Sequence, residues 1–131
     1  MNCPWSAETR LSAGYQGRYG ELVAASWLRT RGMKVLRKNF RWGNHGEIDL
    51  VCREEDTLVF VEVKSARSHW GGAPSYRITE GKRSLMRQGA RYWCLHLQRE
   101  VPVRFDVVEV WLQGGRRPVL RHTPSAFPPV G

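Results

Sequence analysis

Two stretches near the middle of the chain alternate apolar and polar side chains with a period of two, which is the pattern of a β-strand. They span residues 46–51 and 57–64, with a charged break at residues 53–56 between them. Because the break is only a few residues long, the pattern predicts a β-hairpin with antiparallel strands. Asp49 would then lie roughly opposite Glu62, on one face of the sheet.

The other elements follow from the same kind of periodicity. Helical or strand patterns are present in four further stretches, which are residues 14–30 (helix), 33–41 (strand), 79–97 (helix) and 104–112 (strand). The order helix, three strands, helix, strand predicts an α/β fold with a mixed β-sheet flanked by helices. We expect one domain over residues 14–112, preceded by a loose arm at residues 1–13. The Pro- and Arg-rich segment 113–131 is predicted to be a tail of irregular structure.

The composition adds an expectation about partners. The chain has 131 residues, with 21 Lys and Arg against 12 Asp and Glu, which gives a net charge of +9 and a pI near 10.2. A positive excess of this size favours a polyanionic partner, of which nucleic acid is the simplest. Small basic proteins are common, however, so the charge by itself decides little.

Cysteine usage and hydropathy exclude several protein classes. The three cysteines, at positions 3, 52 and 94, form no CxxC pair, so neither a zinc site nor a disulfide framework is predicted. Reduced thiols and a cytoplasmic location are the simplest expectation. No apolar run approaches the length of a membrane span, so no membrane partner is expected.

The predicted hairpin places acidic and basic groups on one face. Two carboxylates within about 5 Å of each other repel unless a proton or a cation lies between them. Oxygen ligands suit a hard divalent cation such as Mg²⁺. Lys64 follows Glu62 on the same face, where an ammonium group can orient an attacking water or stabilise charge on a phosphate. Alternatively, these charges form a solvated strand face with cross-strand ion pairs. Phe60 lies on the same face, however, which predicts that this face is half-buried.

Glu21 is a further candidate acid in the first predicted helix. It does not lie on the apolar stripe of that helix, but on a flank of mostly small residues that includes Gly14, Gly17 and Ala25. Such a flank lets a helix approach a sheet closely. Glu21 is therefore either an additional acid directed at the hairpin or a surface carboxylate that is favourable near a helix start.

Basic residues that we expect to contact nucleic acid occur in three places. They are Lys34, Arg37, Lys38, Arg41, Arg67 and Lys82. The first four are interleaved with Phe40 and Trp42, a combination suited to a nucleic-acid backbone with bases nearby, or to an edge strand protected by charge. Arg67 lies in a predicted substrate-side loop. Lys82, in the first turn of the second helix, either reaches a phosphate or is an ordinary lysine whose stem covers apolar surface.

Asp49 followed by Glu62-x-Lys64 on the next strand resembles the core of the PD-(D/E)xK nuclease motif, with Ile48 in place of the usual proline. The chain as a whole resembles the YraN family, small bacterial proteins named as uncharacterised proteins or candidate endonucleases. The segments that carry this likeness are Gly17–Ala24, Asn39, Gly46–Val51, Phe60–Lys64, Lys82 and Arg104–Val108. The likeness covers roughly residues 14–112 and extends, more distantly, to archaeal Holliday-junction resolvases.

The resemblance implies a restriction-endonuclease-like core and a metal-dependent nuclease, acting on DNA of branched or non-duplex structure. Asp49 and Glu62, with the Val63 carbonyl, would bind Mg²⁺ or Mn²⁺. Glu21 would hold a second ion or a water, and Lys64 would assist the attacking water. Resolvase-like action would also need two sites and hence a homodimer. The alternatives are a non-catalytic nucleic-acid-binding module and a protein-interaction module with a basic surface.

Overall fold

The part of the chain that the structure describes forms two helices and five strands. In chain order they are α1 (Ala13–Thr30), β1 (Lys34–Arg41), β2 (Glu47–Glu54), β3 (Thr57–Ala66), α2 (Glu80–Cys94), β4 (Val103–Trp111) and β5 (Val119–Phe127). The computed structural model describes residues 13–66, 78–113 and 115–130. Within these ranges, neither helix has the length and apolar character needed to cross a membrane.

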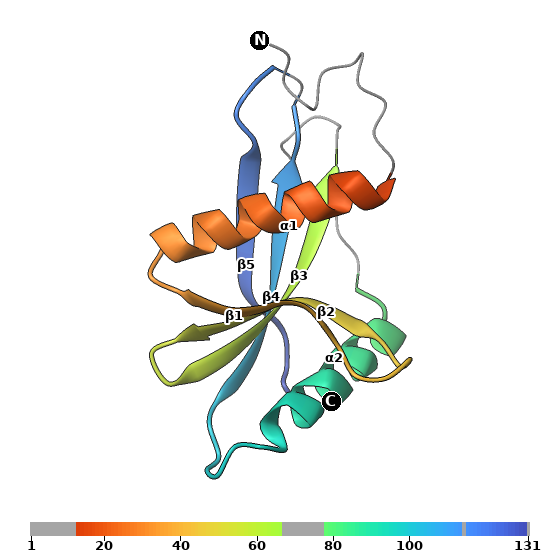
Figure 1. The fold of residues 1–131 in the computed structure, drawn as a ribbon, viewed down its shortest axis with the longest axis vertical. Coiled ribbons are helices and arrows are strands. Elements are labelled where there is room, and N and C mark those ends of the chain that lie inside the picture. Colours follow the sequence, from red (N-terminus) through yellow and green to blue (C-terminus); the bar gives the residue numbers. More distant parts are fainter. Residues whose placement is uncertain (1–12, 67–77, 114, 131) are drawn as a thin grey trace.

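The strands lie in one sheet in the order β1-β2-β3-β4-β5 (Figure 1). The pairs β1–β2, β2–β3 and β4–β5 are antiparallel, whereas β3 and β4 are parallel. A parallel pair needs a crossover connection, and the segment that contains α2 provides it. The prediction of an α/β fold, with a mixed sheet flanked by helices, is confirmed.

Each helix covers a different face of the sheet, because successive residues of a strand point to opposite faces. Val61 of β3 belongs to a buried cluster with Ala24 and Leu28 of α1. Its neighbour Phe60 belongs to a second cluster, with Met86 of α2. In Figure 1, α1 runs across the strands, while α2 lies on the other side, below β2. The central strands are therefore buried on both faces, which explains their long apolar runs.

The hairpin predicted from the period-two pattern is confirmed. Strands β2 and β3 pair in antiparallel register from Leu50 opposite Val61 down to the turn at Glu55 and Asp56. Glu55 has a φ of 52°, in the left-handed region that tight turns require. This register places Asp49 and Glu62 at the open end of the hairpin, away from the turn.

The prediction of an irregular tail was wrong for residues 119–127, which form β5 at the edge of the sheet. Pro124 weakens the strand pattern, but proline is tolerated on edge strands and at bulges. The register between β4 and β5 shifts beside Asp106, and the Ser125 N–H donates to the Asp106 carboxylate at 3.0 Å. A buried carboxylate in β4 thus supplies a hydrogen-bond partner that the local sequence of the tail does not reveal.

Candidate functional site

Strands β2 and β3 separate at the position of Asp49. The pairing of β2 with β3 extends from the turn to Leu50 and stops before Asp49. The pairing of β2 with β1 continues past Asp49 to Glu47, which lies opposite Arg41. The Val63 N–H donates to the Asp49 Oδ2 atom at 2.7 Å, so this side chain bridges the strands where their register ends. The separation opens the end of the hairpin to side chains from both helices.

The carboxyl groups of Asp49 and Glu62 come close together at this position, near enough for each charge to affect the other. Burial raises the pKa of Asp49 to about 8, and the negative charges of Glu62 and Glu21 act in the same direction. The hydrogen bond from the Val63 N–H opposes this rise but does not cancel it. The two residues therefore lie side by side, as the period-two pattern predicts, and the charge of Glu62 favours the protonated form of Asp49.

Glu62 is buried, with 5% of its surface exposed, and two lysines neutralise it. The Lys64 Nζ lies 3.1 Å from one carboxylate oxygen, and the Lys82 Nζ lies 3.5 Å from the other. Lys64 belongs to the same strand, as predicted. Lys82 comes from the first turn of α2, where Thr79 caps the helix by accepting a hydrogen bond from the Lys82 N–H. Lys82 therefore lies within the acidic site, beside a carboxylate.

Glu21 reaches the site from α1. One residue earlier, Gly20 packs directly on β3, and a Cβ at this position would collide with the side chain of Ser65. The close approach is made by Gly20 and not by Gly17 of the predicted small flank, which has open space around it, and it sets the Glu21 carboxylate beside the hairpin. Oxygen atoms of Glu21, Glu47 and Asp49 lie within 4.8 Å of one another. We call Glu21, Glu47, Asp49 and Glu62 the acid cluster.

Glu47 and Asn39 belong to the site, although residue patterns assigned no role to them. The Asn39 Nδ2 donates to Glu21 at 2.7 Å and to Glu47 at 2.8 Å, so it holds two carboxylates in place. Asn39 has a φ of 54°, which asparagine adopts more readily than most residues. The period-two spacing of Glu47 and Asp49 was a usable signal for Glu47. For Asn39 only the family resemblance singled out the position.

The remaining basic residues lie along the edge of the sheet. Lys34, Arg37 and Lys38 are exposed on β1, and Arg41, at the end of that strand, pairs with Glu47 at 3.2 Å while its side chain stays 70% exposed. Strand β1 is an edge strand, so this placement fits both interpretations of the cluster, a surface for a phosphate backbone and a charged edge. Arg67 lies outside the described residues.

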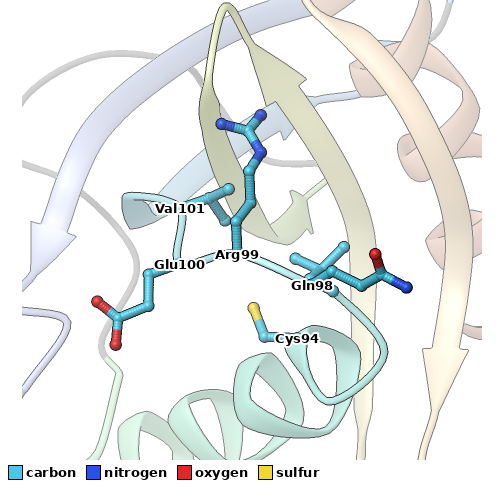
Figure 2. Close-up of a pocket in the computed structure, with 6 residues that line it drawn as sticks. Cys94, Gln98, Arg99, Glu100 and Val101 are labelled. Carbon is cyan, nitrogen blue, oxygen red and sulfur yellow. The ribbon is translucent and has the colours of Figure 1, made fainter.

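Figure 2 shows a hollow elsewhere on the molecule, between the end of α2 and the start of β4. Cys94 and residues 97–101 line it, and Arg99 there pairs loosely with Asp56, at 3.8 Å and with both side chains exposed. The hollow shares no residue with the acid cluster. The convergent carboxylates and lysines therefore make the separation of β2 and β3, and not this hollow, the candidate site.

The family described as "Uncharacterised protein family UPF0102" matches residues 20–110 of the chain. The chain belongs to this family, which is the YraN family. The UPF0102 match contains the whole acid cluster and both lysines, whereas β5 lies beyond it.

Several bacterial UPF0102 proteins are similar to the chain over most of its length. The UPF0102 protein of Anaeromyxobacter dehalogenans is 43% identical over 112 residues, which cover 85% of this chain and 82% of that protein. The UPF0102 protein of Nocardia farcinica is 39% identical, covering 85% and 87% of the two chains. That of Trichlorobacter lovleyi is also 39% identical, with coverages of 85% and 88%.

Proposed function

We propose that this UPF0102 protein is a metal-dependent nuclease that hydrolyses phosphodiester bonds in nucleic acid. The observation that carries the proposal is the convergence of Glu21 from α1, Asp49 from β2 and Glu62 from β3 where the two strands separate. Lys64 stands beside them, 3.1 Å from Glu62. Carboxylates from three elements around one position, next to an ammonium group, match the chemistry of phosphoryl transfer.

The donor set fits a hard divalent cation. Every ligand candidate in the acid cluster is a carboxylate oxygen, which favours Mg²⁺ or Mn²⁺ over metals that prefer sulfur or imidazole. The raised pKa of Asp49 points in the same direction, because a cation would replace the proton that relieves repulsion from Glu62 and Glu21. Asp49 and Glu62 would bind the ion, with the Val63 carbonyl as a further ligand, and Glu21 would hold a second ion or a water.

The residues of the site divide the work of hydrolysis. A bound Mg²⁺ would supply Lewis-acid stabilisation of the charge on the phosphate. Lys64 orients the water whose oxygen attacks phosphorus, and it stabilises the negative charge that builds on the phosphoryl oxygens. As the water oxygen bonds to phosphorus, the bond from phosphorus to the leaving oxygen breaks; the water gives up one proton to solvent and the leaving oxygen takes up one, so that the sum is the addition of water across the bond. Glu62, held between Lys64 and Lys82, fixes both ammonium groups beside the reacting phosphate.

The substrate that we propose is DNA of branched or non-duplex structure. The exposed lysines and arginines of β1 supply positive charge along one edge of the sheet, next to the acid cluster. Phosphate contacts of this kind position a strand without reading its sequence. Cleavage of both strands of a junction needs two sites, so we propose that the protein acts as a homodimer on such substrates.

A second candidate function is non-catalytic binding of nucleic acid. The observation that favours it is internal neutralisation of the site: Lys64 and Lys82 both pair with Glu62, and Arg41 pairs with Glu47. Ion pairs of this kind can hold a fold together without any cation. The two functions differ in one measurable respect, since only the nuclease requires a divalent ion.

Cleavage of labelled junctions, flaps, duplexes and single strands tests the proposal, with Mg²⁺, with Mn²⁺ and with chelator. We expect cleavage of at least one branched or unpaired substrate, dependent on the metal. Asp49→Asn keeps the shape of the side chain but removes its charge, so cleavage should collapse while nucleic-acid binding survives. Lys64→Ala should leave metal binding intact and slow cleavage by about 10²–10³, the usual loss of one electrostatic stabiliser.

Lys38→Ala is the matched control for Lys64→Ala, because it removes one ammonium group from β1 without touching the acid cluster. It should weaken binding and leave the rate of cleavage at saturation unchanged. Absence of cleavage in the wild type under every metal condition, together with no Mg²⁺-dependent change in its melting temperature, would discard the nuclease in favour of the binding module.

A further inference from the structure

An open hollow of about 500 Å³ lies between the end of β1 and the C-terminal half of α2. Its walls include four aromatic side chains, which are Phe40, Trp42, Tyr92 and Trp93. Phe40 stacks on Trp42, with ring centroids 5.8 Å apart, and meets Trp93 edge-on at 5.1 Å. We call this feature the aromatic hollow. It lies on the α2 side of the sheet and adjoins the hollow of Figure 2, with which it shares Leu97.

The inner wall of the aromatic hollow is formed by Trp42, which is buried and contacted on two sides. Trp42 is only 4% exposed, and its Nε1 donates to the Gln88 side chain of α2 at 3.0 Å. The Trp42 ring packs on Gly89, where there is no room for a Cβ, so α2 and the Trp42 ring are in close contact. A ring fixed on one side by a hydrogen bond and on the other by backbone is held before any ligand arrives, which lowers the entropic cost of binding.

The outer wall is open to solvent. Tyr92 is 43% exposed, and Leu97, which also lines the aromatic hollow, is 40% exposed. Within the described part of the chain, Tyr92 belongs to neither buried cluster. The ring lies loosely stacked on His45, with centroids 6.5 Å apart, and its exposed surface is available to stack on a ligand.

The aromatic hollow is continuous with the acid cluster. Arg41 and Gly43 line both this hollow and a neighbouring one of about 340 Å³, which extends to Glu47. Glu47 belongs to the acid cluster, and Arg41 lies 3.2 Å from it. A phosphate at Arg41 would thus stand between the aromatic rings on one side and the carboxylates on the other.

We propose that the aromatic hollow binds an unpaired base of the nucleic-acid strand whose phosphate contacts Arg41. The proposal rests on the proposed nuclease function for the role of the neighbouring carboxylates. Bases stack on aromatic side chains whatever their sequence, while basic groups follow the backbone. The exposed Lys38 and Arg41 on β1 complement a phosphate backbone, whereas an uncharged peptide would offer them no anionic group. Bases inside an intact duplex cannot enter, so the hollow selects unpaired or extruded nucleotides.

Binding to three fluorescent probes of equal length, all in chelator, tests the proposal. The probes are an oligothymidylate, an oligonucleotide of the same sugar-phosphate backbone without bases, and a blunt duplex. The wild type should bind the oligothymidylate more tightly than the base-free strand. Tyr92→Leu keeps apolar bulk and helix propensity but removes the aromatic face. It should weaken oligothymidylate binding by about 5- to 150-fold and leave the other two affinities unchanged.

Two matched variants control for the loss of apolar surface. Tyr92→Phe keeps the ring and should retain wild-type affinity. Leu95→Ala removes a side chain that is 70% exposed next to α2 but does not line the aromatic hollow, and it should change nothing. Equal affinity of the wild type for the strands with and without bases would overturn the proposal, and that comparison requires no variant.

Other occupants would give different results. If Tyr92→Leu left all three affinities unchanged but converted a dimer to a monomer in sedimentation, the occupant would be a second copy of the chain and the proposal would fall. Because no metal is present in these measurements, they do not depend on cleavage. If the protein binds bases through Tyr92 but never cleaves, the base-binding proposal stands and the nuclease proposal falls. If it cleaves but Tyr92 has no effect on binding, the nuclease proposal stands and the base-binding proposal falls.

Discussion

Asp49 lies half-buried beside the three other carboxylates of the acid cluster, and burial together with the charges of Glu62 and Glu21 raises its pKa to about 8. In the unfolded chain the same group titrates near 3.8. Between these pH values the folded protein therefore holds a proton that the unfolded chain has released. By linkage, this group makes the folded state less stable as the pH rises from about 4 to about 8. A carboxylate kept at such a cost is typical of a functional site.

We predict that Asp49→Asn stabilises the metal-free protein, and more so at pH 8 than at pH 5. The wild type should lose up to about 1.4 kcal/mol of unfolding free energy per pH unit through this group, and the amide cannot titrate. Urea unfolding of both proteins in chelator at the two pH values measures the difference in their unfolding free energies. The titration of groups that both proteins share cancels in this difference. Added Mg²⁺ should stabilise the wild type and not the variant. A variant that is less stable at both pH values would show that Asp49 is a partner in a stabilising ion pair.

At the scale of elements, β5 depends on one buried residue of β4. Asp106 is fully buried, with Arg104 at 2.9 Å, His122 at 2.7 Å and the Ser125 N–H at 3.0 Å. Burial by itself would raise the pKa of Asp106, but the hydrogen bonds from His122 and Arg104 hold it below its ordinary value. The carboxylate therefore fastens an edge strand whose own sequence has weak strand character.

Asp106→Ala should lower the unfolding free energy by roughly 3 kcal/mol, the low end for a broken buried ion pair, because Arg104 keeps Glu54 as a partner at 2.9 Å. Since the pKa of Asp106 is lowered in the folded state, its contribution is present above pH 3.8 and is lost below it. Denaturant unfolding and amide exchange in β5 measure the effect. Asp56→Ala, which removes an 81% exposed carboxylate, is the control and should change stability by less than about 0.5 kcal/mol. An equal effect of the two substitutions would contradict this role of Asp106.

At the scale of the whole molecule, the basic residues behind the net charge of +9 differ in where they lie relative to the acid cluster. Strand β1 is one edge of the sheet and β5 is the other, and exposed basic residues occur near both. Only the β1 edge adjoins the acid cluster, through Arg41 and Glu47. If nucleic acid binds there, its affinity should depend on β1 and fall steeply with salt as counterions are released.

The double variant Arg37→Ala/Lys38→Ala should reduce the slope of log affinity against log salt concentration by about 1.8, which is 0.9 for each phosphate of duplex DNA that is no longer neutralised. Arg116→Ala/Arg117→Ala removes the same charge from exposed positions at the turn between β4 and β5, and it should leave the slope unchanged. Equal effects of the two double variants would mean that binding follows net charge without a defined surface.

Local pattern was sufficient for much of the fold and part of the site. The period-two spacing around Asp49 and Glu62 predicted the hairpin, their common position and the place of Lys64, because a strand alternates its faces whatever surrounds it. The match to the UPF0102 family, over residues 20–110, includes Asp49, Glu62 and Lys64. Helix α2 was predicted for an equally local reason, which is that a helix start is decided by side chains within one turn, here by the cap at Thr79.

Contacts between distant segments decided the rest. Asn39 meets Glu21 across 18 positions, Trp42 meets Gln88 across 46, and the strand that ends the chain depends on Asp106. Sequence by itself determined which residues alternate or recur, because that depends on bond geometry over a few residues. Which acids face one another, which lysines neutralise them and which rings stay exposed was decided only by tertiary structure, because burial, pKa and a preformed hollow arise where separate elements pack together.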